Sequence, residues 1–264
     1  EDAFLKDKVN GVYFDPDKLH WVDFRGDHFN IQGLLNIPRA TQGRPVIIQA
    51  GSSDPGKELA ARTADAVFTA QHTLEDAVEF YSDLKGRMEK YGRSTNSLRI
   101  MPGVFPVVGR SEEEAKEKFE QLQDLIKPEV GLNLLRQHLG GVDLTGYPVD
   151  GPLPDITETN GAKSRRDMLV KYARRENLSI KELYLRISGA RGHWQIVGTP
   201  SSIADQLEEW FIKFAADGFN ILAPSLPNGL LDFTHLVVPE LQKRGLFRTE
   251  YKGNTLRSHL GLHS

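Results

Sequence analysis

The sequence predicts an α/β fold in which strands and helices alternate, and three observations lead to this prediction. Four short apolar stretches are each followed by a stretch whose apolar residues keep helical spacing. This order is typical of parallel strands joined by right-handed helical connections. The segments between each strand and its helix are rich in glycine, serine and proline, as tight turns require. An open doubly wound sheet and a (β/α)8 barrel both fit this order.

The composition indicates a globular protein without strong attraction for nucleic acid. The chain has 264 residues, 39% of them hydrophobic and 26% charged, and a formal net charge of -3. A negative charge provides no basic field for nucleic acid, and no apolar run approaches the roughly 20 residues of a membrane helix. The chain has no cysteine, so it has no thiolate metal site. We expect a soluble, cytoplasmic protein with no nucleic-acid or membrane partner.

Residues 1–44 are expected to form a connecting segment that contains a β-hairpin. Two β-like runs, at 20–24 and 28–32, flank Arg25, Gly26 and Asp27, which places a glycine in the turn. Residues 45–264 are then expected to form the main unit.

The main unit begins with a predicted strand at 46–50 and two predicted helices. Apolar residues keep helical spacing through Phe68, so the first helix is expected to continue to that position. The second helix has its apolar face at 77–88, and Gly92 stands where a C-terminal cap is favoured.

The next unit pairs a predicted strand at 98–108 with a helix. Ser111 and Glu114 form a capping-box pattern at the start of that helix, and Pro128 ends it. The regular alternation then stops at about 127–188, a glycine- and proline-rich stretch with a basic helix near its end. We interpret this stretch as an insertion.

Alternation returns with predicted strands at 193–197 and 219–223. Between them, Thr199 is the expected N-cap of a helix, with Pro200 at its first position, and Gly218 ends that helix. A last helix leads to a polar tail.

The turn after the strand at 46–50 predicts an anion site. Gly51, Ser52 and Ser53 pass directly into a helix, whose first backbone N–H groups point outward and attract negative charge. The plain alternative is a tight turn in which Ser53 or Asp54 only caps the helix. A rival phosphate site is the GTPS turn at 198–201, although its proline lacks an amide.

Six segments resemble a known family of enzymes. They are VIIQAGSSDPGKELAARTADAVFTAQ, MPGVFPVVGRSEEEAKEKFEQL, GYPVDGPLP, GHWQIVGTPSSIADQLEEWF, DGFNILAP and RGLFRTEYKGNTLRSHLGL. Together they closely resemble flavin-dependent monooxygenases of the nitrilotriacetate monooxygenase component A and dibenzothiophene sulfone monooxygenase type, in the bacterial luciferase-like superfamily. The resemblance covers nearly the whole chain in unbroken order.

The resemblance implies a luciferase-like (β/α)8 TIM barrel and a two-component monooxygenase. Such an enzyme oxygenates a small organic substrate with O2, using reduced FMN from a separate flavin reductase. Family members are longer than this chain, which is therefore expected to supply only about the C-terminal half, strands five to eight. An open half-barrel favours association of copies, so we expect a homo-oligomer. The alternative is a truncated flavin- or phosphate-binding remnant without catalysis, lacking the N-terminal half of the active site.

The resemblance also implies roles for individual residues. In the family, the loop after the fifth strand helps to hold the FMN phosphate, and Gly51, Ser52 and Ser53 match that loop. Related two-component enzymes cover the active site with a mobile arginine of the inserted segment, which makes Arg165 and Arg166 the catalytic candidates. A solvated basic helix is the plain alternative for this pair.

Histidines and tryptophans give no sign of a further cofactor. His259 lies in a polar tail without surrounding carboxylates, so we expect no metal. Trp194 and Trp210 lie in apolar patterns and are interpreted as core residues. Arg191 and His193 precede a strand and are expected at the end of the sheet away from ligands.

Overall fold

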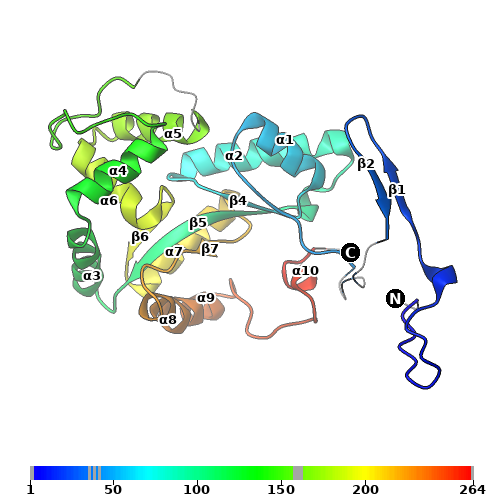
Figure 1. The fold of residues 1–264 in the computed structure, drawn as a ribbon. Coiled ribbons are helices and arrows are strands. Elements are labelled where there is room, and N and C mark those ends of the chain that lie inside the picture. The colour runs from blue at the N-terminus through cyan, green and yellow to red at the C-terminus, as the bar shows by residue number, and fades with distance from the viewer. Residues whose placement is uncertain (1–2, 35–36, 38–39, 41–42, 157–162, 263–264) are drawn as a thin grey trace. The chain divides into compact units, whose positions relative to one another are not determined.

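The computed structural model describes residues 3–34, 37, 40, 43–156 and 163–262, with only the backbone of residues 163–165. The chain divides into two compact units, Glu1–Pro45 and Val46–His263 (Figure 1).

The first unit contains the hairpin that the sequence predicts. Strands β1 (Val22–Arg25) and β2 (Asn30–Gly33) pair antiparallel, and the Gly26 N–H donates to the Phe29 carbonyl at 2.9 Å. A short 3-10 helix, Pro16–Lys18, precedes them.

The second unit is built on a parallel sheet of five strands, which confirms the α/β prediction. The strands are β3 (Ile48–Ala50), β4 (Ala66–Thr69), β5 (Arg99–Val108), β6 (Trp194–Gly198) and β7 (Asn220–Ile221). Strand β5 is the long central strand in Figure 1, and β4, β6 and β7 all pair with it. Val104 pairs with both Trp194 and Ile221, so β6 and β7 lie along opposite edges of β5.

The predicted helix through Phe68 was wrong in its second half. Helix α1 (Asp54–Thr63) ends five residues earlier, where Ala64 turns to an extended conformation. The Asp65 carboxylate accepts the Ile47 N–H at 2.9 Å, and the next residues run beside β3 as strand β4. The described residues of the main unit therefore form five strands rather than the four predicted.

Two groups of helices cover the sheet. Helices α1 and α2 (Leu74–Arg87) pack on β4 and the start of β5 through Ala60, Ala61, Ala64, Val67, Phe80, Leu84, Met88, Leu98 and Ile100. Helix α7 (Pro200–Ile212) packs on β5 and β6, together with α8 (Asn228–Asp232), a π-helical stretch (Phe233–Val237) and α9 (Val238–Lys243). Two 3-10 helices, Glu89–Tyr91 and Thr95–Ser97, connect α2 to β5.

The predicted insertion is a helical layer with its own core. Helix α3 (Glu112–Asp124) leads to α4 (Pro128–His138), α5 (Lys163–Arg175) and α6 (Ile180–Ala190), the last three grouped at one end of the sheet (Figure 1). Their shared core contains Leu135, Leu139, Leu144, Leu169, Ala173, Leu178, Ile180, Leu183, Tyr184 and Ile187. Helices α4 and α6 approach closely at Gly131. A Cβ added there would lie only 2.3 Å from the Tyr184 ring, so the glycine is needed for this packing.

A buried ion pair connects the last helix to the sheet. Arg257, on α10 (Leu256–His259), donates to the Asp65 carboxylate at 2.7 and 3.1 Å. Both side chains are buried, and the same carboxylate accepts the Ile47 N–H, so one group joins α10, β3 and β4.

A membrane-crossing helix would need more length and more apolar residues than any helix in the described part of the chain has.

Candidate functional site

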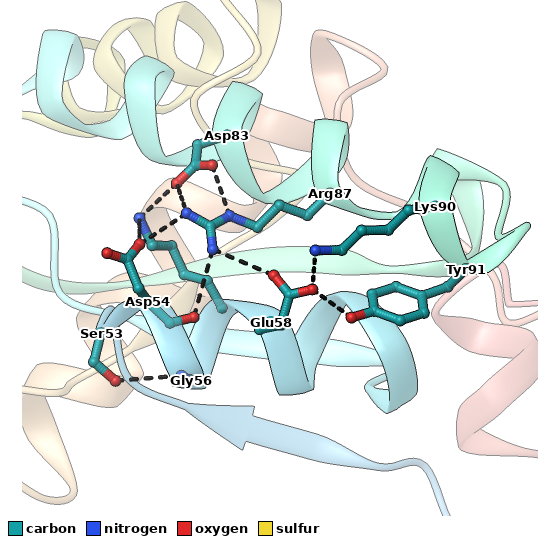
Figure 2. Close-up of polar contacts among 9 residues, drawn as sticks. Ser53, Asp54, Gly56, Glu58, Asp83, Arg87, Lys90 and Tyr91 are labelled. Carbon is teal, nitrogen blue, oxygen red and sulfur yellow. Dashed lines mark hydrogen bonds and ion pairs between the residues drawn. The ribbon is translucent and has the colours of Figure 1, made fainter.

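The predicted anion-binding turn, Gly51, Ser52 and Ser53, is called the serine loop below. It lies at the carboxyl end of β3, as the sequence predicts. Gly51 has a φ of +121°, a conformation that favours glycine, and Ser52 and Ser53 are exposed. Ser53 is the N-cap of α1, and its Oγ accepts the Gly56 N–H at 3.3 Å (Figure 2). A hydroxyl can accept one hydrogen bond and donate another, so capping leaves Ser53 able to donate to an anion.

Ion pairs fix the start of α1 against α2. The Arg87 guanidinium contacts Asp54 at 2.8 Å and Asp83 at 2.7 Å (Figure 2). Lys57 contacts Asp83 at 2.5 Å. Hydrogen bonds from Arg87 hold the pKa of the Asp54 and Asp83 carboxyls below their ordinary values. Carboxylates thus neutralise the cations beside the loop, so the donors that the loop itself offers to an anion are its own N–H and hydroxyl groups.

The rival turn at 198–201 already has a carboxylate in place. Thr199 caps α7, and the Glu112 carboxylate accepts both the Thr199 N–H at 3.3 Å and the Ser202 hydroxyl at 3.2 Å. A second negative charge would meet repulsion there and would find these donors occupied. This geometry favours the serine loop over the rival turn.

A cavity of about 320 Å³ opens beside Ser52. Its walls come from the ends of β3 and β4, from α2 and from α5, and include Gln71, Asp76 and Lys171. Asp76 pairs with Arg175 at 3.1 Å and with Lys171 at 3.6 Å. This larger cavity is therefore polar but has no excess of unpaired positive charge among its described lining.

A smaller cavity of about 220 Å³ adjoins the larger one. Both cavities are lined by His72 and Tyr172, whose rings stack with centroids 4.8 Å apart and planes 8° apart. The smaller cavity is also lined by Arg186, His193 and Gln195. The ring pair therefore forms a wall shared by the two cavities, with His72 following β4 and Tyr172 supplied by the insertion.

The expectation that His193 lies away from ligands was wrong. Strand β4 pairs with Arg99–Pro102 of β5, whereas β6 pairs with the later residues Val104–Val108. Because β6 begins where β4 ends, His193 lies at the carboxyl end of β4 and stacks on Phe68, with ring centroids 4.9 Å apart.

Of the two predicted arginines, only Arg166 has a described side chain, and it lies outside both cavities. The side chain of Arg165 lies outside the described residues. Arg166 is 7% exposed and donates to the Asp167 carboxylate at 2.8 and 2.9 Å, while its Nη1 has no hydrogen-bond partner in the described structure. It lines neither of the two cavities. Arg166 is thus no solvated surface residue, and a catalytic role for either arginine stays a prediction.

Sequence reasoning missed His72, Tyr172 and Arg186 as residues of the site. Tyr172 lies on α5 and Arg186 on α6, and no sequence motif connects them. Their helical positions within the insertion were the only available signal, since the packing of α5 and α6 brings them together.

The sequence also predicts that Trp194 and Trp210 are core residues and that no metal is bound. Trp194 and Trp210 stack on each other with centroids 3.9 Å apart. Trp210 is 3% exposed, which confirms its core role, whereas Trp194 is partly buried and lines the smaller cavity. Within the ranges that the structure describes, no three His, Asp or Glu side chains are grouped as metal ligands.

The serine loop fits the phosphate of a flavin nucleotide. It offers two exposed hydroxyls and the N-terminus of a ten-residue helix, and it lies at the carboxyl end of a parallel sheet. The adjoining cavity extends from Ser52 toward the insertion, which leaves room beyond the phosphate position.

Comparisons with known proteins agree with the resemblance. The luciferase-like monooxygenase profile matches residues 19–217. Nitrilotriacetate monooxygenase component A of Aminobacter aminovorans is 56% identical over 99% of this chain and 58% of the relative. The crystal structure of DmoA from Hyphomicrobium sulfonivorans has a TM-score of 0.85 at 30% identity, covering 98% of this chain and 55% of DmoA. Riboflavin lyase RcaE, crystallised with modified FMN and riboflavin, has a TM-score of 0.79 at 29% identity, covering 100% of this chain and 57% of RcaE.

The chain spans somewhat over half the length of these relatives. The matches cover nearly all of the chain, and they do not bear out the narrower prediction that it supplies only the C-terminal half of a closed barrel. They do confirm the family to which the sequence segments pointed and the α/β fold of that family. The chain belongs to the luciferase-like monooxygenase family.

Proposed function

We propose that the protein oxygenates a small organic substrate with O2, using reduced FMN supplied by a separate flavin reductase. The main support is the 56% identity, over 99% of the chain, to nitrilotriacetate monooxygenase component A. The name component A denotes one part of a larger system, which supports the need for a second protein. The non-catalytic alternative is less favoured, because the match to this relative, which is named a monooxygenase, covers nearly the whole chain.

In this proposal, Gly51, Ser52 and Ser53 hold the FMN phosphate. The crystal structure of RcaE with modified FMN supports flavin binding by this fold. The bound flavin supplies the redox chemistry, and the protein supplies binding, orientation and exclusion of water. His72 and Tyr172 line both the cavity beside the serine loop and the smaller cavity.

Oxygenation can be tested by mixing the protein with an NADH-dependent FMN reductase, NADH, FMN and isotope-labelled O2. We expect labelled oxygen in a product when an aminocarboxylate or a sulfur heterocycle is added. Catalase removes the peroxide that free reduced flavin generates, and a reaction without the protein is the control. Stoichiometric FMN binding without any labelled product across the panel would favour the non-catalytic alternative.

Association of copies and closure of a (β/α)8 barrel stay predictions. Sedimentation equilibrium over a range of protein concentrations checks the first, since a monomer at all concentrations contradicts it.

A further inference from the structure

We propose that the smaller cavity binds a carboxylate group of the organic substrate through Arg186. This inference rests on the proposed function, and it names the substrate class: small molecules that carry a carboxylate at one end.

The geometry of Arg186 suits a carboxylate. Its Nη1 donates to the Tyr172 hydroxyl at 2.6 Å, and the guanidinium carbon lies 5.7 Å from the centre of the Tyr172 ring. Arg186 is an exposed residue, and this contact orients one edge of its guanidinium while Nε and Nη2 have no partner among the described residues. Two adjacent N–H groups in one plane match the two oxygens of a carboxylate.

No described carboxylate forms a close ion pair with Arg186, although the charge of Glu182 acts on it at longer range. Glu182, one turn earlier on α6, uses its carboxylate to accept the Ser179 N–H and hydroxyl, both at 2.8 Å. The described residues contain no acidic oxygen within 4.0 Å of the Arg186 guanidinium, whereas Arg175 in the larger cavity pairs with Asp76 at 3.1 Å. Of the two cavities, the smaller one therefore attracts an anion.

The lining of the smaller cavity carries the same chemistry. It consists of Arg186, His72, His193 and Gln195, with aromatic and apolar neighbours and no Asp or Glu. Gln195 donates to the Arg186 main-chain carbonyl at 3.0 Å, which joins α6 to β6. Several polar groups thus converge on a space whose shape is held by both the insertion and the sheet.

The volume limits the ligand. About 220 Å³ is below the range of roughly 300–1,000 Å³ that holds a whole drug-sized molecule. The cavity therefore takes a terminal group, and the remainder of the substrate extends past His72 and Tyr172 toward the larger cavity and the serine loop. This arrangement sets the carboxylate and the FMN phosphate in separate places.

The test is calorimetric titration with nitrilotriacetate and with its uncharged trimethyl ester. Wild-type protein is expected to bind the acid more tightly than the ester, and Arg186→Met is expected to weaken binding of the acid roughly 10- to 100-fold, as for loss of a charged hydrogen bond. Arg186→Lys keeps the charge without the planar fork and should fall between them. The matched control is Arg174→Met on the exposed side of α5, where Arg174 pairs with Asp155 at 2.6 Å; it should leave binding unchanged.

The inference is overturned if wild-type protein does not bind nitrilotriacetate, if the ester binds as tightly as the acid, or if Arg186→Met leaves the affinity unchanged. It is also overturned if Arg186→Met weakens FMN binding instead, because Arg186 would then hold the cofactor. If Arg186→Met does not fold by circular dichroism, Arg186→Lys decides. Arg186-dependent binding of nitrilotriacetate without oxygenation of any substrate would refute the proposed function while leaving this carboxylate site standing.

Discussion

Replacing Ser53 with alanine tests whether the serine loop holds the FMN phosphate. The Ser53 hydroxyl has two tasks in this proposal: it accepts the Gly56 N–H at 3.3 Å as the cap of α1, and it donates to the phosphate. The two tasks are measurable separately, because capping affects the stability of the protein and the second task affects only the affinity for FMN.

The expected magnitudes differ for the two tasks. Loss of an N-cap side chain costs about 1 kcal/mol, which lowers the melting temperature by roughly 2–4 °C in a protein of this size. Loss of a hydrogen bond to a charged group costs about 1.5–3 kcal/mol, so the Kd for FMN should rise roughly 10- to 100-fold. Riboflavin has no phosphate, and its affinity should not change.

Thr199→Ala provides the matched control. Thr199 caps α7 as Ser53 caps α1, and each helix has a proline in its first turn. The stability loss should be similar, but FMN affinity should stay at the wild-type value because Glu112 already occupies the donors of that turn.

The assay is quenching of flavin fluorescence on titration with protein, followed by thermal melting of each variant. The proposed phosphate site would be refuted by an unchanged FMN affinity in Ser53→Ala. Equal weakening of FMN and riboflavin, or the same loss in Thr199→Ala, would show that the effect is a general loss of structure.

Three further predictions concern stability. Asp65→Asn should lower the free energy of unfolding in urea by about 3–5 kcal/mol, because it removes the negative charge that the buried Arg257 guanidinium contacts at 2.7 Å; a loss below about 1 kcal/mol contradicts this. Hydrogen bonds from Arg87 lower the pKa of Asp83 in the folded state. The contribution of the ionised Asp83 carboxylate to the stability of the fold is therefore complete above the unfolded carboxyl pKa of about 4, and it is lost as the pH falls through the folded pKa. Urea midpoints between pH 2 and pH 7 should therefore fall less steeply with acid in Arg87→Met than in wild type, and identical slopes contradict this. Gly131→Ala should destabilise the insertion by about 1–3 kcal/mol through overpacking of α4 against α6, which hydrogen exchange in these helices can measure; unchanged exchange contradicts close packing there.

Much of the fold was predictable because strong local signals mark its elements. The capping pattern at Ser111 does start a helix, and the hydrophobic run of β5 is a strand. Strand β4 was missed for a physical reason: Ala64, Val67 and Phe68 follow α1 with helical spacing, and no glycine or proline separates them from it. The signal that ends α1 is the hydrogen bond from Ile47 to Asp65, a contact that only the folded structure reveals.

The candidate site was predictable only where it lies next to a strand end. The serine loop was found because a strand, a glycine and a helix start are adjacent in sequence. His193 was misplaced because the sequence does not reveal that β6 pairs with the later half of β5. Tyr172 and Arg186 are on different helices, and their contact depends on packing within the insertion.

Strand β5 pairs along its ten residues with three different partners. It therefore pairs with both the strand that leads to His72 and the strand that begins after His193, although more than one hundred residues of chain separate the two histidines. A sequence change in the middle of β5 is therefore expected to alter its register with both β4 and β6, and so to change the spacing between two imidazoles that lie outside β5.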